Sequence, residues 1–231
     1  MTLYGFKALK ENIKNIDHVD ISNHKVNEID FLKNNGIKYT IRAQSFFNNF
    51  KGINHQFVVS YTIKQKNNDL QSFLSKVNLD KKIIFVIVDS IMDPHNFGAI
   101  LRTCEAFNVD GVIYKKDNQV QITDVVSKTS QGAADRLNLF RVTNLSNAIQ
   151  ILKENKFWIY SSALIDSSTN YKDINYDDHT VLIIGNEERG VSKGVIEASD
   201  FVIKIPMLGT SQSLNVSVAT GILLAEIALK K

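Results

Sequence analysis

The chain has 231 residues, 44% of them hydrophobic, which is enough for one large or two small domains with a genuine core. No apolar run approaches the length of a membrane span, and the single cysteine, Cys104, excludes an intrachain disulfide and fits a reducing compartment, so we expect a cytoplasmic protein. Of the net charge of +3, the excess lies in residues 1–80, with 11 Lys and Arg against 7 Asp and Glu, whereas residues 81–231 have 16 against 17. This distribution suggests a polyanion contact in the N-terminal third, although a solvated lysine-rich surface would have the same charge.

Residues 1–63 are predicted to form a compact α/β domain. The start of the chain has no secretory apolar segment and favours an amphipathic helix over residues 3–16. The other elements expected here are strands at 19–21, 37–41 and 56–63 and helices at 25–35 and 44–50. His18, His24 and His55 are scattered through this part, and we expect surface or turn positions for each.

A polar stretch at residues 64–80 is predicted to link this domain to a second one at 81–231. Short apolar runs typical of buried strands then alternate with helical patterns, which indicates an α/β domain with a mostly parallel sheet covered on both faces. We expect strands at 83–88, 111–114, 138–142, 157–161, 181–184 and 201–205, and helices at 97–108, 123–130, 145–155, 192–198 and 216–230.

The loop after the first of these strands could carry chemistry. Pro94 and Asn96 indicate a helix start with Asn96 at or near the N-cap, where an Asn side chain normally turns back on the backbone. A glycine early in a helix, as at Gly98, usually marks a close backbone approach. Arg102 lies one turn further on the same face and suits a phosphate or a developing oxyanion, although a salt bridge to Glu105 is equally compatible with the spacing.

Two further loops leave strand ends in the same domain. In the segment I-G-N-E-E-R-G at 184–190, a carboxylate between two glycines could accept hydrogen bonds from a ligand, or Glu187 and Glu188 could simply favour the start of the next helix. After the last strand comes a loop of Gly, Thr, Ser, Gln and Asn at 206–215, where Ser213 and Asn215 are either ligand-binding residues or ordinary N-cap residues. The chain has no G-x-G-x-x-G, no P-loop, no G-x-S-x-G elbow and no Cys/His cluster with metal spacing, so we expect no metal.

Together these three loops resemble the motifs of the SpoU/TrmH ribose 2′-O-methyltransferases of the SPOUT superfamily. The matching patterns are D-P-x-N-x-G-A-I-x-R at 93–102, I-G-N-E-x-x-G at 184–190 and I-P-M-x-G-x-x-x-S-L-N-V-S-x-A at 205–219, and T-S-Q-G-A at 129–133 also resembles a family stretch. Segments 4–9 and 52–56 resemble the L30e-like RNA-binding domain of the subgroup that methylates a guanosine of 23S ribosomal RNA. Phe57 departs from that subgroup, which usually has glycine there.

The resemblance implies a C-terminal trefoil knot, a homodimer and S-adenosyl-L-methionine (AdoMet) as cofactor. By matching position, backbone groups around Gly185, Ile205 and Leu214 would hold AdoMet, and Ile184, Met207 and Ser213 would line its pocket. Arg102 would meet the target ribose and its phosphate, assisted by Asn96, Glu187, Ser213 and Asn215, either taking the proton or only stabilising the oxyanion.

The implied activity is methylation of a ribose 2′-hydroxyl in 23S ribosomal RNA, either naked or in a precursor particle, with no membrane contact. The N-terminal domain favours ribosomal RNA over transfer RNA as substrate. Three alternatives stay open: a transfer-RNA methyltransferase of the same family, a resistance-type enzyme acting on another ribosomal nucleotide, and a catalytically silent RNA-binding or ribosome-assembly protein.

Overall fold

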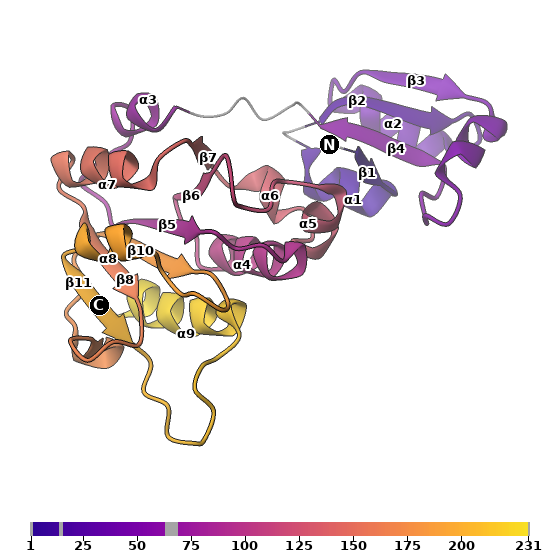
Figure 1. Cartoon of the computed structure of the whole chain (residues 1–231). Coiled ribbons are helices and arrows are strands. Elements are labelled where there is room, and N and C mark those ends of the chain that lie inside the picture. Colours follow the sequence, from indigo (N-terminus) through magenta and orange to yellow (C-terminus); the bar gives the residue numbers. More distant parts are fainter. Residues whose placement is uncertain (1, 14–15, 63–68, 231) are drawn as a thin grey trace. The chain divides into compact units, whose positions relative to one another are not determined.

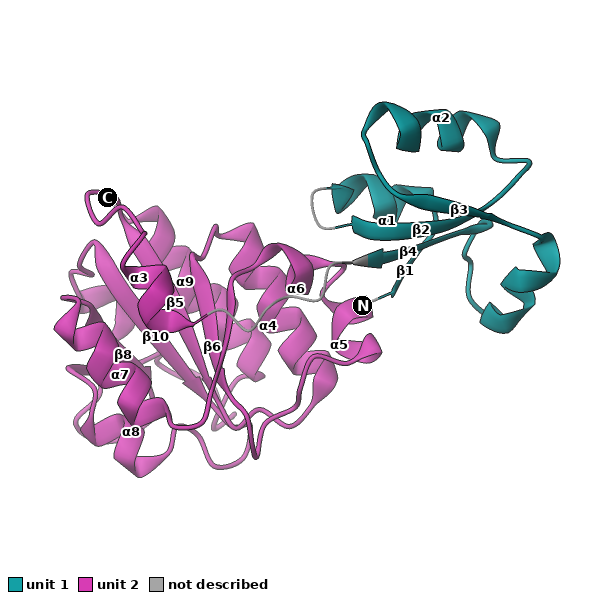
Figure 2. Ribbon diagram, turned by 90° about the horizontal axis from the view of Figure 1, so that it is seen from above, with its two compact units in different colours: residues 1–66 teal, residues 67–231 magenta. Residues whose placement is uncertain are grey.

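A computed structural model describes residues 2–13, 16–62 and 69–230. The chain divides into two compact units, residues 1–66 and 67–231, hereafter the first and the second unit (Figure 2). Of the expected linker at 64–80, residues 64–68 lie outside the described residues. The remainder belongs to the second unit, because helix α3 (Leu70–Leu74) buries Leu70 and Leu74 in that unit's core.

The first unit is a four-stranded mixed sheet with helices. Its elements are β1 (Thr2–Tyr4), α1 (Phe6–Glu11), β2 (Ile16–Ser22), α2 (Val26–Asn34), β3 (Tyr39–Arg42), the 3₁₀ helix η2 (Gln44–Phe50) and β4 (Val58–Thr62). The strand order is β1-β4-β2-β3; β4 is antiparallel to β1 and β2, whereas β3 is parallel to β2. Leu9 of α1 and Leu32 of α2 pack with Val19, Ile21 and Val58 of the sheet in one small core.

The predicted helix at 3–16 is wrong at both ends. Leu3 pairs with Ser60 in the sheet, and Gly5 then turns the chain with φ 85°, a value that glycine adopts at little cost. Only Phe6–Glu11 is helical, and Ile16 already begins β2. Local amphipathic spacing is therefore overruled by strand pairing that the sequence pattern does not reveal.

The second unit is built on a seven-stranded parallel sheet, which confirms the expected α/β architecture. Its strands are β5 (Ile83–Asp89), β6 (Gly111–Lys115), β7 (Leu139–Val142), β8 (Trp158–Ser162), β9 (Thr169–Asn170), β10 (His179–Gly185) and β11 (Phe201–Lys204), in the order β7-β6-β5-β10-β8-β11-β9. All neighbouring pairs are parallel. The expected six strands are all present; the seventh, β9, has two residues, which is too short to show a sequence pattern.

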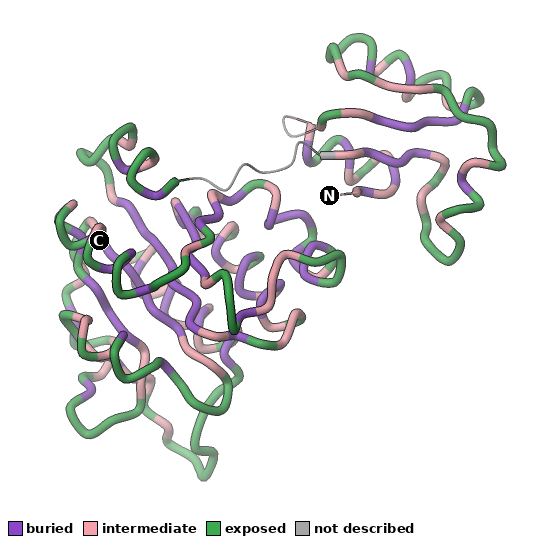
Figure 3. Tube along the Cα trace, turned by 45° about the horizontal axis from the view of Figure 1, so that its top comes forward, coloured by how far each residue is buried: buried purple, intermediate pink, exposed green. Residues whose placement is uncertain are grey.

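Helices cover both faces of this sheet (Figure 1). They are α4 (Pro94–Ala106), α5 (Asp124–Thr129), α6 (Ala133–Arg136), α7 (Leu145–Glu154), α8 (Lys193–Glu197) and α9 (Val216–Leu229), with the 3₁₀ helix η3 (Tyr171–Asp173). Along β5, Val86 and Val88 pack into one core with α4 and α9, whereas Phe85 and Ile87 pack into a second core with α3 and α7. Central strands buried on both faces (Figure 3) give the near-continuous apolar runs seen in the sequence.

No helix among the described residues is long and apolar enough to cross a bilayer. The trefoil knot implied by the family resemblance stays a prediction.

Candidate active site

The candidate site lies where β5 and β10 end side by side. The two strands are paired in register up to Asp89 and Gly185, so the loops that follow them leave the same edge of the sheet. In open α/β sheets, ligands bind outside this carboxyl edge. Helix α9, which follows the loop after β11, packs on α4 and contacts β10.

Asp89 anchors this edge from within. Its carboxylate is 1% exposed and accepts hydrogen bonds from the Ser192 backbone N–H and the Ser90 hydroxyl, each at 2.9 Å, while the Lys115 ammonium lies 2.9 Å from Oδ1. Burial alone would raise the pKa of Asp89, but the hydrogen bonds from Ser192, Lys115 and Ser90 outweigh it and hold the pKa below its ordinary value. The buried charge therefore ties the loop after β5 to the start of α8.

A tight turn follows β10. Asn186 and Gly190 exchange two backbone hydrogen bonds, and the Asn186 carboxamide donates to the Ser90 carbonyl at 2.8 Å. A Cβ on Gly185 would lie 2.2 Å from the Gly190 carbonyl carbon, and Gly190 itself has φ 68°. Both glycines are therefore required by the turn, which presents Glu187 towards α4.

Asn96 connects the three loops. Asn96 lies in the first turn of α4, near the N-cap as expected, but its side chain does not cap the helix: Asp93 does so by accepting from the His95 N–H at 2.9 Å, and Pro94 is the first helical residue. The Asn96 side chain is thereby released from capping, so that it donates to Glu187 Oε1 at 2.9 Å and accepts from the Asn215 carboxamide at 3.0 Å. Residues from all three motifs thus meet directly.

Gly98 is the close approach that its position predicted. A Cβ there would lie 2.6 Å from the Thr129 Cβ and 3.0 Å from the Val126 carbonyl oxygen, so α5 packs directly on the α4 backbone. Thr129 also begins the T-S-Q-G-A stretch. Glycine at position 98 therefore allows the short distance between α4 and the T-S-Q-G-A stretch.

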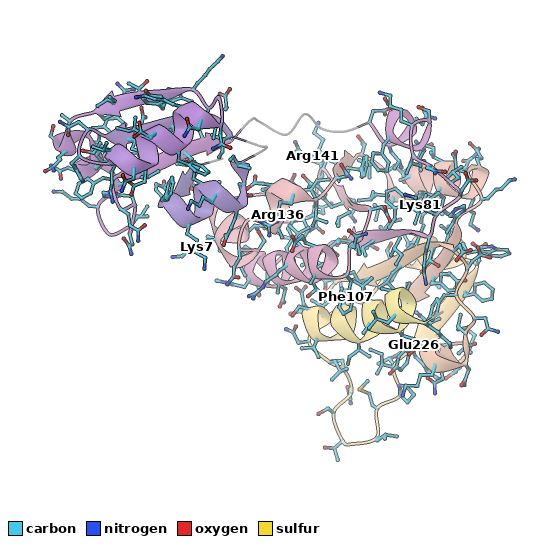
Figure 4. All side chains as sticks on the ribbon, turned by 180° about the vertical axis from the view of Figure 1, so that it is seen from behind. Lys7, Lys81, Phe107, Arg136, Arg141 and Glu226 are labelled. Carbon is cyan, nitrogen blue, oxygen red and sulfur yellow. The ribbon has the colours of Figure 1, made fainter. Side chains whose placement is uncertain are left out.

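Arg102 lies on the surface of α4, and among the described residues it has no hydrogen bond or ion pair. The alternative salt bridge to Glu105 does not form, because Glu105 is taken by Arg136 of α6, labelled in Figure 4, at 2.8 Å. The Arg102 guanidinium keeps its N–H donors for an external oxyanion or phosphate.

The expected cofactor residues fall into two groups. Ile184 is buried at the end of β10 next to Gly185, and Ile205 packs against the same core. Met207, Ser213 and Leu214 belong to the loop between β11 and α9, which extends away from the second unit in Figure 1.

Of the two predicted catalytic residues in that loop, Asn215 contacts Asn96, whereas Ser213 lies apart from the other predicted catalytic residues. Asn215 is the N-cap of α9, accepting from the Ser217 N–H at 2.9 Å while its amide reaches Asn96, so it has both of the roles considered for it. Ser213 is exposed, with no hydrogen bond among the described residues.

Sequence reasoning missed Asp89, Ser90 and Asn186. An aspartate that directly ends a fully apolar strand was the available signal for Asp89, since such a carboxylate must find partners at the sheet edge. Ser90 has φ 65°, and nothing in the sequence marks that conformation.

The family model "SpoU rRNA Methylase family" matches residues 83–225. An uncharacterized tRNA/rRNA methyltransferase, MG252 of Mycoplasma genitalium, is 41% identical over 229 residues, which cover 96% of this chain and 94% of that protein. A TrmH family tRNA/rRNA methyltransferase of Staphylococcus saprophyticus is 37% identical over 247 residues, covering 100% and 96%.

Two solved structures bear on the fold. The SpoU methyltransferase AviRb of Streptomyces viridochromogenes superposes with a TM-score of 0.82 at 17% identity, covering 100% of this chain and 89% of that one, and shows a shared fold. The TrmH/SpoU tRNA modifying enzyme of A. aeolicus has a TM-score of 0.60 at 36% identity, covering 70% of this chain and 80% of that one.

Proposed function

Because the chain belongs to the SpoU rRNA methylase family, we propose that it methylates the ribose 2′-oxygen of a guanosine in 23S ribosomal RNA, using AdoMet. The observation that carries this proposal is the hydrogen-bonded group Glu187–Asn96–Asn215, formed by residues of all three motif loops. The same helix, α4, presents Arg102, which has no hydrogen bond or ion pair within the part of the chain that the structure describes.

The residues present fit AdoMet as the cofactor. Loop residues 206–214 make no backbone hydrogen bonds to the described chain, so their N–H and C=O groups can bind the cofactor's polar atoms. Ile205, Met207 and Leu214 offer apolar side chains within or next to this loop, whereas Ile184 lies in the core behind the site. Gly185 and Ser213 complete the set that would hold the cofactor. This pairing of apolar side chains with free backbone groups is typical of small-molecule sites.

When bound, AdoMet supplies a methyl group on a positively charged sulfur. The methyl carbon would pass to the 2′-oxygen as its bond to sulfur breaks, which would leave neutral S-adenosylhomocysteine, and the hydroxyl proton would go to water. Arg102 orients the ribose and its phosphate and stabilises the charge that develops on the oxygen, since a guanidinium keeps its own proton at neutral pH. Asn96 holds the Glu187 carboxylate and the start of α9 in one fixed arrangement, so most of the rate enhancement comes from positioning.

A transfer-RNA substrate is the second candidate. It is favoured by the A. aeolicus neighbour, which is named as a tRNA modifying enzyme and is 36% identical over the matched 70% of this chain. We also propose a cytoplasmic homodimer; exposed apolar side chains at Met92, Leu208 and Val218, respectively 59%, 99% and 51% exposed, support a partner surface in the second unit.

Transfer of radiolabelled methyl from AdoMet to ribosomal and transfer RNA from cells lacking the gene tests the function. Label at one 2′-oxygen of 23S RNA is expected; label in transfer RNA would select the second candidate. Arg102→Lys should lower kcat/KM by at least about tenfold, because an ammonium lacks the bidentate geometry, while AdoMet binding is unchanged. Absence of both AdoMet binding and label would leave the silent RNA-binding alternative.

A further inference from the structure

We propose that the second unit binds a Lys- and Arg-rich protein segment on a surface formed by the rings of Trp158 and Phe201 and the carboxylates of Asp177 and Asp178, hereafter the acidic aromatic patch. The proposal goes beyond the proposed function, because it concerns a protein partner and not the RNA or the cofactor. No part of it depends on the reaction.

The patch lies at the opposite edge of the second sheet from the candidate active site. Trp158 begins β8 and Phe201 begins β11, and these two strands lie side by side (Figure 1). Trp158 is paired with Thr180 of β10, five residues before Gly185, which corresponds to about 16 Å along the strand at about 3.3 Å per residue. A partner on the patch therefore leaves the loops at the carboxyl ends of β5 and β10 accessible.

Four aromatic rings form a row at this edge. The ring centroids are 5.8 Å apart between Trp158 and Phe201, 5.1 Å between Phe201 and Tyr160, and 5.0 Å between Tyr160 and Tyr176. Tyr160 is buried, whereas Trp158 is 45% and Phe201 39% exposed. An isolated apolar side chain at the surface is ordinary, but two large rings in contact there are typical of an interaction site.

Acidic side chains surround the exposed rings. The segments that lead into β8, β10 and β11, residues 153–157, 171–178 and 197–200, contain three lysines and six aspartates and glutamates. Burial raises the pKa of the Tyr160 hydroxyl, and the charges of Asp177 and Asp200 raise it further, so both carboxylates lie close to the row. Asp200 is paired with Lys153 at 2.7 Å. Asp177 and Asp178 are exposed and have no ion pair among the described residues, so both can pair with an external cation.

This combination of rings and carboxylates fits a cationic partner. The face of a tryptophan ring attracts a guanidinium or an ammonium, and a carboxylate can bind a guanidinium through two hydrogen bonds. The phosphates of a nucleic acid would instead be repelled by the acidic side chains. Lys- and Arg-rich protein segments are common in proteins that bind nucleic acids. We therefore assign the patch to such a segment, with a guanidinium over Trp158.

Trp158 is the chain's single tryptophan, so its fluorescence reports on the patch directly. Titration of the full chain with octa-arginine, without RNA or AdoMet, should change the emission to saturation, whereas octa-glutamate should not change it. The anisotropy of fluorescein-labelled octa-arginine gives the affinity of variants. Trp158→Leu and the double variant Asp177→Asn with Asp178→Asn should each weaken binding about fivefold or more, because a ring face or two charges are lost.

Asp166→Asn is the matched control. It removes an exposed carboxylate from the loop after β8, at the other edge of the sheet, and should change the affinity less than about twofold. Thermal unfolding of each variant verifies that the fold is kept. Asp177 and Asp178 are exposed, so the double variant keeps the test valid if Trp158→Leu unfolds.

The same measurements identify other occupants. An equal change in Trp158 emission with oligouridine would assign the patch to a nucleic acid, and a change on dilution of the protein alone would assign it to a second copy of the chain. Either result, or unchanged octa-arginine affinity in the folded variants, would overturn the proposal. Because neither RNA nor methyl transfer enters the octa-arginine titration, its outcome is independent of whether the proposed function holds.

Discussion

Replacing Asp89 with asparagine should destabilise the second unit without changing its shape. Asn has nearly the same volume, but it removes the charge that pairs with Lys115 and leaves one of the two hydrogen-bond donors, the Ser192 N–H or the Ser90 hydroxyl, less well satisfied. Breaking a fully buried ion pair costs about 3–5 kcal/mol. Since the Lys115 side chain is 23% exposed and can be hydrated in the variant, we expect Asp89→Asn to lower the free energy of unfolding by about 2–4 kcal/mol.

Urea unfolding followed by tryptophan fluorescence measures this cost specifically. The chain has one tryptophan, Trp158, and it lies in β8 of the second unit. Asp166→Asn serves as the control, because Asp166 is exposed and has no ion pair or side-chain hydrogen bond among the described residues; its change should stay within about 0.5 kcal/mol.

The pH dependence provides a second readout of the same variant. Because the pKa of Asp89 is lowered in the folded state, the unfolded chain binds more protons than the folded one as the pH falls below the ordinary aspartate value of 3.8. The stability from Asp89 is therefore present above that value and is lost as the pH falls through the folded pKa. The wild type should lose more stability in acid than Asp89→Asn. Equal stability of the two proteins at pH 7, or parallel acid profiles, would refute the anchoring role of this carboxylate.

Two further predictions concern α4 and its neighbours. Asn96→Ala removes both hydrogen bonds that join the motif loops and should lower kcat/KM by about tenfold or more. The thermal midpoint should change little, since Asn96 is only half-buried and both hydrogen bonds lie at the surface. Methyl-transfer kinetics on the identified RNA would decide, and near-normal turnover would contradict the positioning role. Gly98→Ala should lower the free energy of unfolding of the second unit by about 1–3 kcal/mol, because the added Cβ would overlap Thr129. Gly221→Ala in α9 is the control: the nearest atom to its added Cβ is 3.9 Å away, so it should be neutral or stabilising by up to about 1 kcal/mol. Urea unfolding compares the two variants, and equal effects would refute the close approach of α5.

The second sheet could be predicted largely from the sequence because its central strands are buried on both faces. β5 and β10 are apolar nearly throughout, and a continuous apolar run of this length is typical of a parallel strand that is buried on both faces. β1 and β9 could not be predicted, since a strand of two or three residues has no periodicity and exists only through its neighbours. Gly5 adopts a conformation that its residue type permits but does not require.

The candidate site was predictable in its residues but not in its connections. Helix-capping rules allow Asp93 or Asn96 to cap α4, and only the folded chain shows that Asp93 does so. The links from Asn96 to Glu187 and Asn215 depend on strand order, which local patterns do not contain. For Phe57, the residue type alone would argue against a left-handed φ, and the surrounding rings decide otherwise.

The span of these links has a consequence for synthesis of the protein. Asn96 is 91 residues from Glu187 and 119 from Asn215 along the chain, so the first bond can form only after β10 has left the ribosome and the second only after the start of α9 has done so. Contacts between residues this distant in sequence require a large loss of chain entropy before they form, and they therefore slow folding. The residues of the first unit therefore leave the ribosome well before Asn215, and the three motif loops can be joined only after residue 215 has emerged.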